Sequence, residues 1–232
     1  MGVKLSRQKK RNWTLSILYK LSKLPVLNNK AKFKFFLNLE WVFDRLSHEK
    51  SFEMYSNETH PLRVYSNNYI LNLIKETDTV LDLGCHAGQI TSVIASKAKS
   101  VVGIDYDAEA ITQANKIYKK ANLIFVNDEV SNYLNSNSQV FDVLILSHIL
   151  EHIDNPELII MNCKPFVNYM YIELPDFDKS YMNHYRKDFG CDLIYTDIDH
   201  VSEFDRMEIK SLVKKCGFDL LESEYRFGVQ RH

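Results

Sequence analysis

Glycine and acidic residues that could bind a nucleotide follow short apolar runs at the start of the chain's central region. The first run, residues 80–83, leads through Gly84 and Gly88 into a helical pattern. The next run ends in Asp105, 21 positions after Gly84. A glycine turn lets a ligand lie against bare backbone, and an acid at this distance is placed to bind ribose hydroxyls. The pattern predicts a nucleotide-binding corner.

Two further apolar runs extend the pattern. Residues 122–128 end in Asp128, and residues 141–146 are followed by Ser147. Alternating apolar runs and helical patterns favour a mainly parallel sheet covered by helices on both faces. The carboxyl ends of parallel strands meet at one edge of a sheet, so we expect these polar groups to surround one ligand.

In order, the stretches VLDLGCHAG, VVGID, IFVND and FDVLILSHILEHIDNP resemble a class I S-adenosylmethionine-dependent methyltransferase over roughly residues 79–218. They are similar to the branch that methylates small molecules, lipid precursors and sugars. The resemblance implies an α/β, Rossmann-like fold: a seven-stranded, mainly parallel sheet with helices on both faces and an N-terminal helical extension. His86 stands where the family's turn has its middle glycine, and histidine tolerates a left-handed backbone better than most residues.

The resemblance also implies a set of residues for binding S-adenosylmethionine. These residues are Asp82, Gly84, Cys85, Gly88, Asp105, Tyr106, Asp128 and Ser147. The first three would border the methionine part of the cofactor, and Asp105 would hold the ribose. Tyr106 would flank the adenine, and Asp128 would accept a hydrogen bond from its amino group.

Three histidines are candidates for taking a proton from the methyl acceptor, because the unperturbed pKa of histidine lies near neutrality. His200 precedes a helix similar to the family's final-helix motif, where a substrate-side histidine is frequent, and it is the leading candidate. His148 directly follows the fourth apolar run, and His152 comes one helical turn later, so the two can share a face. A structural role is the alternative for each.

The sequence predicts no metal site. Asp197, Asp199 and His200 lie near one another, but a spacing of two residues in a loop is weak support for metal binding. The four cysteines are widely spaced and form no CxxC pair, which favours a reduced, cytoplasmic protein. No run of 18 apolar residues predicts a membrane-spanning helix.

Charge is distributed unevenly along the chain. Residues 1–39 contain ten Lys or Arg and no acid, whereas the rest of the chain has 19 basic and 30 acidic residues. We therefore divide the chain into a basic N-terminal helical extension or lid, residues 1–60, and a methyltransferase domain, residues 61–232. A basic amphipathic helix can lie on an anionic membrane, so residues 1–34 are a candidate peripheral contact with the inner face of the membrane. The alternatives are a helix packed on the core and an oligomer contact.

The favoured function is O-methylation of a sugar or surface-polysaccharide precursor, and the basic N-terminus would suit a phosphorylated, nucleotide-linked or lipid-linked acceptor. This preference comes from a similarity of the final-helix region and the long N-terminal extension to methyltransferases of bacterial glycan synthesis. The loop after residue 146 lacks the Asn/Asp-Pro-Pro-aromatic motif of enzymes that methylate nucleic-acid bases, which argues against that class. Methylation of a natural product or lipid-quinone precursor is the main alternative. An RNA modifier using the basic segment and a non-catalytic cofactor-binding scaffold are others.

Overall fold

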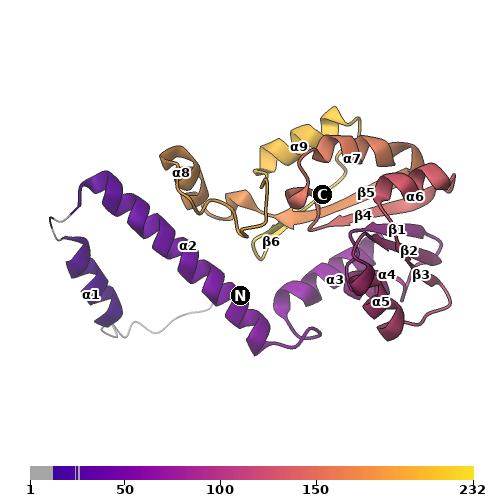
Figure 1. Cartoon of the computed structure of the whole chain (residues 1–232), viewed down its shortest axis with the longest axis horizontal. Coiled ribbons are helices and arrows are strands. Elements are labelled where there is room, and N and C mark those ends of the chain that lie inside the picture. Colours follow the sequence, from indigo (N-terminus) through magenta and orange to yellow (C-terminus); the bar gives the residue numbers. More distant parts are fainter. Residues whose placement is uncertain (1–12, 24, 26) are drawn as a thin grey trace.

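The computed structural model describes residues 13–23, 25 and 27–232, and the described residues contain a seven-stranded sheet (Figure 1). The order of its strands is β3-β2-β1-β4-β5-β7-β6. The first five strands pair in parallel, and β7 is antiparallel to both β5 and β6. The strands are β1 (Thr79–Leu83), β2 (Ser100–Asp105), β3 (Leu123–Asn127), β4 (Phe141–Ser147), β5 (Val167–Pro175), β6 (Glu224–Arg226) and β7 (Val229–Arg231). The predicted α/β fold is confirmed.

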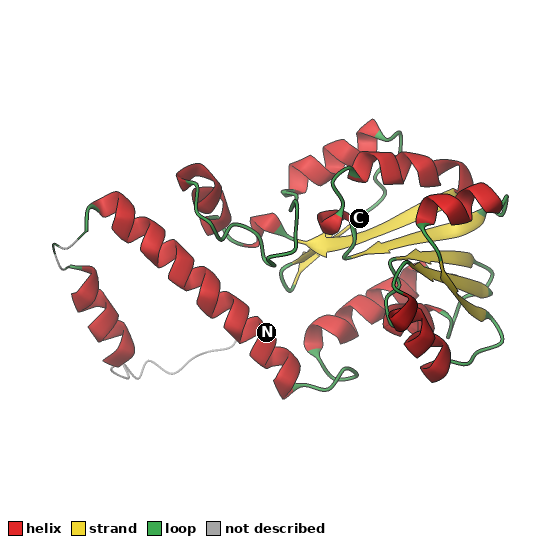
Figure 2. Cartoon of the chain, in the orientation of Figure 1, coloured by secondary structure: helices red, strands yellow, loops and turns green. Residues whose placement is uncertain are grey.

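Helices cover both faces of this sheet (Figure 2). Leu81 and Leu83 pack with the helices of one face, and Val80 packs with those of the other, because successive residues of a strand point to opposite sides. One face carries α6 (Val130–Ser136), α7 (Pro156–Cys163) and α9 (Arg206–Lys215). The other carries α3 (Pro61–Leu73), α4 (Gln89–Ile94) and α5 (Ala108–Ile117). Helices on both faces of the sheet leave β1 almost continuously buried, with apolar residues at three of its positions, Val80, Leu81 and Leu83.

The helices of the core begin at the residues that the sequence indicates. Asp107 accepts hydrogen bonds from the first-turn amides of α5, and Asn155 does the same for α7, whose first residue is Pro156. Asp205 and Glu208 form a capping box at the start of α9. Gly217 follows α9 with a positive φ of 76°.

Three local patterns of the sequence, a polar loop over residues 132–139, a helix over residues 33–46 and an irregular stretch over residues 175–200, differ from the structure, the second only in its bounds. Residues 132–139 were expected to be a loop, but α6 forms there because the buried Leu134 anchors it to the core. The helix expected over residues 33–46 extends as α2 (Asn29–Met54). The stretch 175–200, expected to be irregular, contains α8 (Met182–Phe189), whose ring residues pack against α2.

The N-terminal helices project from the sheet (Figure 1). Leu37 is the one buried residue of α2, and α1 (Trp13–Ser22) precedes it. The aromatic side chains of Trp13 and Tyr19 are more than half exposed. Residues 1–12 of the predicted basic extension lie outside the described residues. Within the described part of the chain, no helix combines the length and apolar character needed to cross a membrane.

Candidate cofactor and acceptor sites

The turn after β1 contains several residues in the left-handed backbone region. Gly84, His86 and Gly88 have φ angles of 71°, 45° and 75°. A Cβ atom on Gly84 would lie 2.6 Å from Ile149, and one on Gly88 would lie 2.4 Å from Phe125. Both glycines are therefore required by backbone conformation and by close packing, and His86 occupies the same backbone region as a non-glycine residue.

Asp105 anchors this turn from the neighbouring strand. Its Oδ2 accepts a hydrogen bond of 2.7 Å from the His86 amide, and its Oδ1 accepts one of 2.9 Å from the Asp107 amide. The carboxylate is nearly buried at the end of β2. Each oxygen keeps a second lone pair, so the anchored group can still accept from ribose hydroxyls.

Two buried residues lie behind the turn. Asp82 accepts a 2.7 Å hydrogen bond from the Thr91 hydroxyl. Burial raises the pKa of Asp82 to about 7, the nearby charge of Asp105 adds to this rise, and the Thr91 hydrogen bond opposes it. Burial also raises the pKa of the Cys85 thiol, which therefore stays protonated and unreactive.

The remaining residues predicted to bind the cofactor lie at the same edge of the sheet. Tyr106 is exposed beside Asp105, and the Asp128 amide donates to the Asp105 carbonyl oxygen at 3.2 Å. The Ser147 hydroxyl at the end of β4 is buried and has no hydrogen-bond partner in the described chain. An anchored acid, a glycine turn and an unpartnered hydroxyl on one edge have the chemistry that fits S-adenosylmethionine.

His148 is held at the end of β4 by two buried glutamates. Its Nδ1 lies 3.2 Å from Glu151 Oε1, and its Nε2 lies 3.5 Å from Glu173 Oε1. Burial lowers the pKa of His148, but the two carboxylates outweigh this effect, so the pKa is raised. Glu173 also pairs with the fully buried Arg231 at 2.7 Å. The two carboxylates therefore favour the protonated form of His148.

The other two candidate bases lie against each other. The rings of His152 and His200 meet edge to face, with their centres 4.7 Å apart. His200 Nδ1 lies 2.6 Å from Glu203 Oε1, and His152 Nδ1 lies 3.5 Å from Asp199 Oδ2. Burial lowers the pKa of His200, and the Glu203 carboxylate more than compensates. His152 ends a short 3-10 turn, Leu150–His152, rather than the α-helical turn that the sequence suggested.

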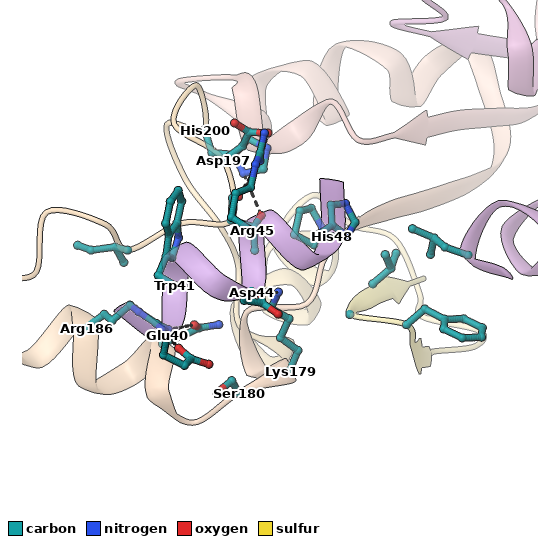
Figure 3. A pocket seen from close by; sticks show the side chains of 18 of the residues that line it. Glu40, Trp41, Asp44, Arg45, His48, Lys179, Ser180, Arg186, Asp197 and His200 are labelled. Carbon is teal, nitrogen blue, oxygen red and sulfur yellow. Dashed lines mark hydrogen bonds and ion pairs between the residues drawn. The ribbon is translucent and has the colours of Figure 1, made fainter. Parts of the chain in front are cut away.

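A cavity of about 530 Å³ opens between α2 and this end of the sheet (Figure 3). His148 and His200 line its inner side, and Phe227 and Val229 close another. The side chains that α2 contributes are Glu40, Trp41, Asp44, Arg45, His48 and Phe52. The cavity therefore joins two of the predicted catalytic histidines, His148 and His200, to the N-terminal extension, whereas His152 is not among its lining residues.

Polar contacts attach α2 to the segment after β5. The Trp41 indole donates to the Tyr195 carbonyl oxygen at 2.6 Å. Arg45 donates to the Thr196 carbonyl oxygen at 3.0 Å and pairs with Asp197 (Figure 3). Lys179 pairs with Asp44 at 2.7 Å. These contacts give the cavity its outer wall.

Sequence reasoning missed Trp41 and Arg45, because neither belongs to a motif and both act through partners about 150 residues away. Glu173 had a usable signal, since an acid inside an apolar strand must find a buried partner. The three residues weighed and rejected as a metal site take separate partners. Asp197 pairs with Arg45, whereas Asp199 lies beside His152.

Comparisons with known proteins identify the family. Residues 60–223 match a family described as a methyltransferase domain. The chain is 30% identical over 112 residues to a ubiquinone biosynthesis O-methyltransferase of Serratia proteamaculans, a match covering 47% of this chain and 45% of that protein. The match thus spans about half the length of this curated relative.

Two solved structures are similar in fold. A SAM dependent methyltransferase from Archaeoglobus fulgidus gives a TM-score of 0.56 at 20% identity, over 69% of this chain and 70% of that chain. The N-methyltransferase NodS from Bradyrhizobium japonicum WM9, in complex with S-adenosyl-L-homocysteine, gives 0.55 at 14% identity, over 75% and 88%. Because the family match covers most of the chain, the chain belongs to the methyltransferase-domain family.

Proposed function

We propose that this methyltransferase O-methylates a small, hydroxylated and largely uncharged acceptor, with a sugar or glycan precursor as the first choice. The acceptor occupies the cavity between α2 and the ends of the strands. Residues 1–60 act as its lid, and residues 61–232 carry the cofactor. The observation that carries the proposal is the pairing of charges in the cavity wall.

The charged side chains of the wall largely neutralise one another. Arg45 pairs with Asp197, Lys179 with Asp44, and Arg186 with Glu40. Paired charges leave fixed donors and acceptors for hydroxyl groups but little net attraction for an anion. Trp41 adds a large apolar surface of the kind that covers a sugar ring. A neutral polyol suits this wall better than a phosphorylated acceptor or a long apolar tail.

The reaction is a displacement at an activated methyl group, which the cofactor supplies as a sulfonium. The acceptor oxygen forms the new O–CH3 bond as the S–CH3 bond breaks, and the hydroxyl proton passes to a base. The protein's task is to align the acceptor and to remove that proton. His200, held by Glu203, remains the leading candidate base, ahead of His148 and His152.

An aromatic quinone precursor is the second candidate acceptor. The similarity to a ubiquinone biosynthesis O-methyltransferase favours it, and Phe52 and Phe227 could cover an aromatic ring. A phenolic hydroxyl is also more acidic than a sugar hydroxyl, so it needs a weaker base.

The test is transfer of an isotopically labelled methyl group from S-adenosylmethionine to a panel of acceptors. The panel contains neutral sugars, nucleotide sugars and catechols, with RNA as a further arm. We expect the label to appear in the sugar. The Arg45→Ala variant should transfer less methyl group to the sugar and should bind the cofactor as the wild type does. Labelling of catechols alone would replace the sugar with the quinone precursor. Labelling of RNA alone, or of nothing despite cofactor binding, would overturn the proposal.

The membrane contact proposed for residues 1–34 has its own support and its own test. Within α1, Ile17 and Tyr19 are each more than half exposed, and Lys20 lies in the last turn. Apolar and basic groups together suit an anionic lipid surface. Co-sedimentation of the full chain with anionic vesicles, lost at high salt, is expected. The absence of binding at low salt would remove this proposal and leave the enzymatic one intact.

A further inference from the structure

One group of side chains beside the acceptor cavity has the composition of a metal site. Glu151, His152 and His200 each place one ligand atom within 4.8 Å of those of the other two. Glu151 is fully buried, and its Oε2 has no hydrogen-bond partner in the described chain, whereas Oε1 faces His148. A buried carboxylate oxygen without a partner is costly, and a cation would compensate it.

In both histidines, the Nδ1 atom already lies beside a carboxylate. His200 Nδ1 lies 2.6 Å from Glu203, and His152 Nδ1 lies 3.5 Å from Asp199. Histidines that bind metals commonly donate one ring N–H to a carboxylate, which fixes the ring and leaves the other nitrogen for the metal. This arrangement leaves the Nε2 atoms of His152 and His200 as ligands, together with the free oxygen of Glu151.

Backbone hydrogen bonds connect the two segments that supply these ligands. The Glu151 carbonyl oxygen accepts from the Val201 amide at 2.9 Å and from the Ser202 amide at 3.2 Å. His200 is therefore fixed next to the 3-10 turn that carries Glu151 and His152. Ser202 Oγ and Glu203 Oε2 are also buried at this junction, with no hydrogen-bond partner among the residues that the structure describes. A site assembled in this way is organised before any ion binds.

We infer that Glu151, His152 and His200 bind one divalent transition-metal ion, of the Zn²⁺ or Mn²⁺ type, at the inner end of the acceptor cavity. Two imidazoles and one carboxylate suit these ions better than Mg²⁺ or Ca²⁺, which prefer oxygen ligands. Three protein ligands leave coordination positions open. Since His200 lines the cavity, an ion bound to it would lie close to the acceptor.

This inference deepens the proposed function. The role of the metal, which is to bind the acceptor oxygen, rests on the proposed function, whereas the binding of the metal does not. A hydroxyl bound to such an ion loses its proton more easily. Metal binding and general-base catalysis exclude each other at His200 Nε2. The metal would therefore replace the base role of His200 proposed above, and the hydroxyl proton would pass to solvent water in the cavity.

Metal binding is tested on the untagged full chain after treatment with a chelator. Calorimetric titration with Zn²⁺ and with Mn²⁺ is followed by Co²⁺ titration, in which visible absorption reports the ligand geometry. We expect one saturable site per chain for at least one ion. His152→Ala should weaken it more than about 100-fold, and Asp199→Asn by about 10-fold, because loss of a carboxylate partner typically costs 10–100-fold in affinity.

His184→Ala is the matched control, since His184 also pairs with a carboxylate, Asp178, but lies outside the group. It should bind metal like the wild type. Glu151→Gln is a second ligand variant, and His152→Ala, whose side chain is partly exposed, keeps the test valid if Glu151→Gln does not fold. Absence of a saturable site in the wild type, or unchanged binding in His152→Ala, would overturn the metal site.

Cofactor binding and methyl transfer separate this inference from the proposed function. Titration with S-adenosylmethionine and an assay of methyl transfer are repeated on the metal-free protein. Full methyl transfer by metal-free protein would overturn the metal's role and leave the proposed function standing. Lack of transfer to any hydroxylated acceptor, despite bound metal and bound cofactor, would overturn the proposed function and leave the metal site.

Discussion

The cofactor edge and the acceptor cavity are built in different ways. The cofactor edge consists of short motifs at the ends of adjacent parallel strands, held by local hydrogen bonds such as that from the His86 backbone amide to the Asp105 carboxylate. The acceptor cavity is formed between α2 and a segment about 150 residues later, held by side chains such as Trp41 and Arg45. One region is local and buried in the sheet, and the other is assembled from distant, half-exposed pieces.

The two regions therefore depend on different structural features. The cofactor edge depends on backbone conformation and on a few buried carboxylates. The acceptor side depends on how α2 is attached. Changes at the first should abolish cofactor binding, and changes at the second should leave cofactor binding intact while altering acceptor use. The predictions below test this separation, beginning with the largest expected effect.

Gly88→Ala should destabilise the cofactor edge most. The φ angle of 75° strains any other residue, and the new Cβ would lie 2.4 Å from the Phe125 ring. Left-handed strain and overpacking together should cost about 3 kcal/mol of unfolding free energy. Chemical denaturation measures the loss. Gly190→Ala is the control, since its φ is also positive but its Cβ would meet nothing within 4 Å. Equal losses in both variants would contradict the role of packing against Phe125.

Arg186→Ala should release α2 without affecting the cofactor edge. The buried guanidinium donates to the Asn183 side chain at 2.6 Å, to the Leu37 carbonyl oxygen at 3.1 Å and to Glu40. Losing hydrogen bonds of a charged group should cost about 2 kcal/mol locally, which is roughly a 30-fold increase in hydrogen exchange of α2. Affinity for S-adenosylmethionine should not change.

Lys187→Ala is the matched control for Arg186→Ala. Lys187 is the next residue of α8, is mostly exposed and lies 3.6 Å from Glu208. Exchange in α2 should stay at the wild-type rate in this variant. A loss of cofactor binding in Arg186→Ala as large as the loss of α2 protection would show that the two regions are not separable.

The affinity for S-adenosylmethionine should depend on pH through Asp82. Burial raises the pKa of Asp82 to about 7, so below pH 7 the free protein holds this carboxyl neutral. In the proposed complex Asp82 borders the cationic methionine part, which favours the ionised form. Binding must then release the proton, and affinity should rise by up to about tenfold per pH unit from pH 5.5 to 7. Calorimetry on Asp82→Asn should give a flat profile, and a slope that persists in this variant would assign the effect elsewhere.

His86→Gly should have the smallest effect and the opposite sign. Histidine at φ 45° is strained, and glycine removes that strain but adds entropy to the unfolded chain. The net gain should be about 0.5 kcal/mol, or a rise of about 1–2 °C in Tm. A fall in Tm would mean that the His86 side chain stabilises the turn.

The sequence predicts those features of the molecule that depend on residues close together along the chain. The strand ends and the Asp105 position follow from periodicity and spacing. The wall of the cavity does not, because Trp41 and Arg45 gain their partners only when α2 folds back on residues 195–197. The spacing of residues along the sequence also did not indicate the proposed metal-binding group, Glu151, His152 and His200.

The metal-binding group joins two parts of the sequence that are far apart. Glu151 and His152 adjoin in sequence, but His200 meets them through backbone hydrogen bonds from residues 201 and 202 to the Glu151 carbonyl oxygen. Helix α6 was not predicted because its sequence is largely polar and has a single buried residue, Leu134, that attaches it to the core. In both cases a tertiary contact decided what a local pattern could not.

The most direct test of a two-part site is calorimetric titration of S-adenosylmethionine into the wild type, Asp105→Ala and Arg45→Ala, with Asp105→Asn as the conservative variant. Thermal unfolding confirms that each variant folds. Losing two hydrogen bonds from ribose to a carboxylate should weaken binding about 100-fold in Asp105→Ala. Arg45→Ala should bind like the wild type. Absence of binding by the wild type, or equal losses in Asp105→Ala and Arg45→Ala, would contradict the separation of the cofactor edge from the acceptor cavity.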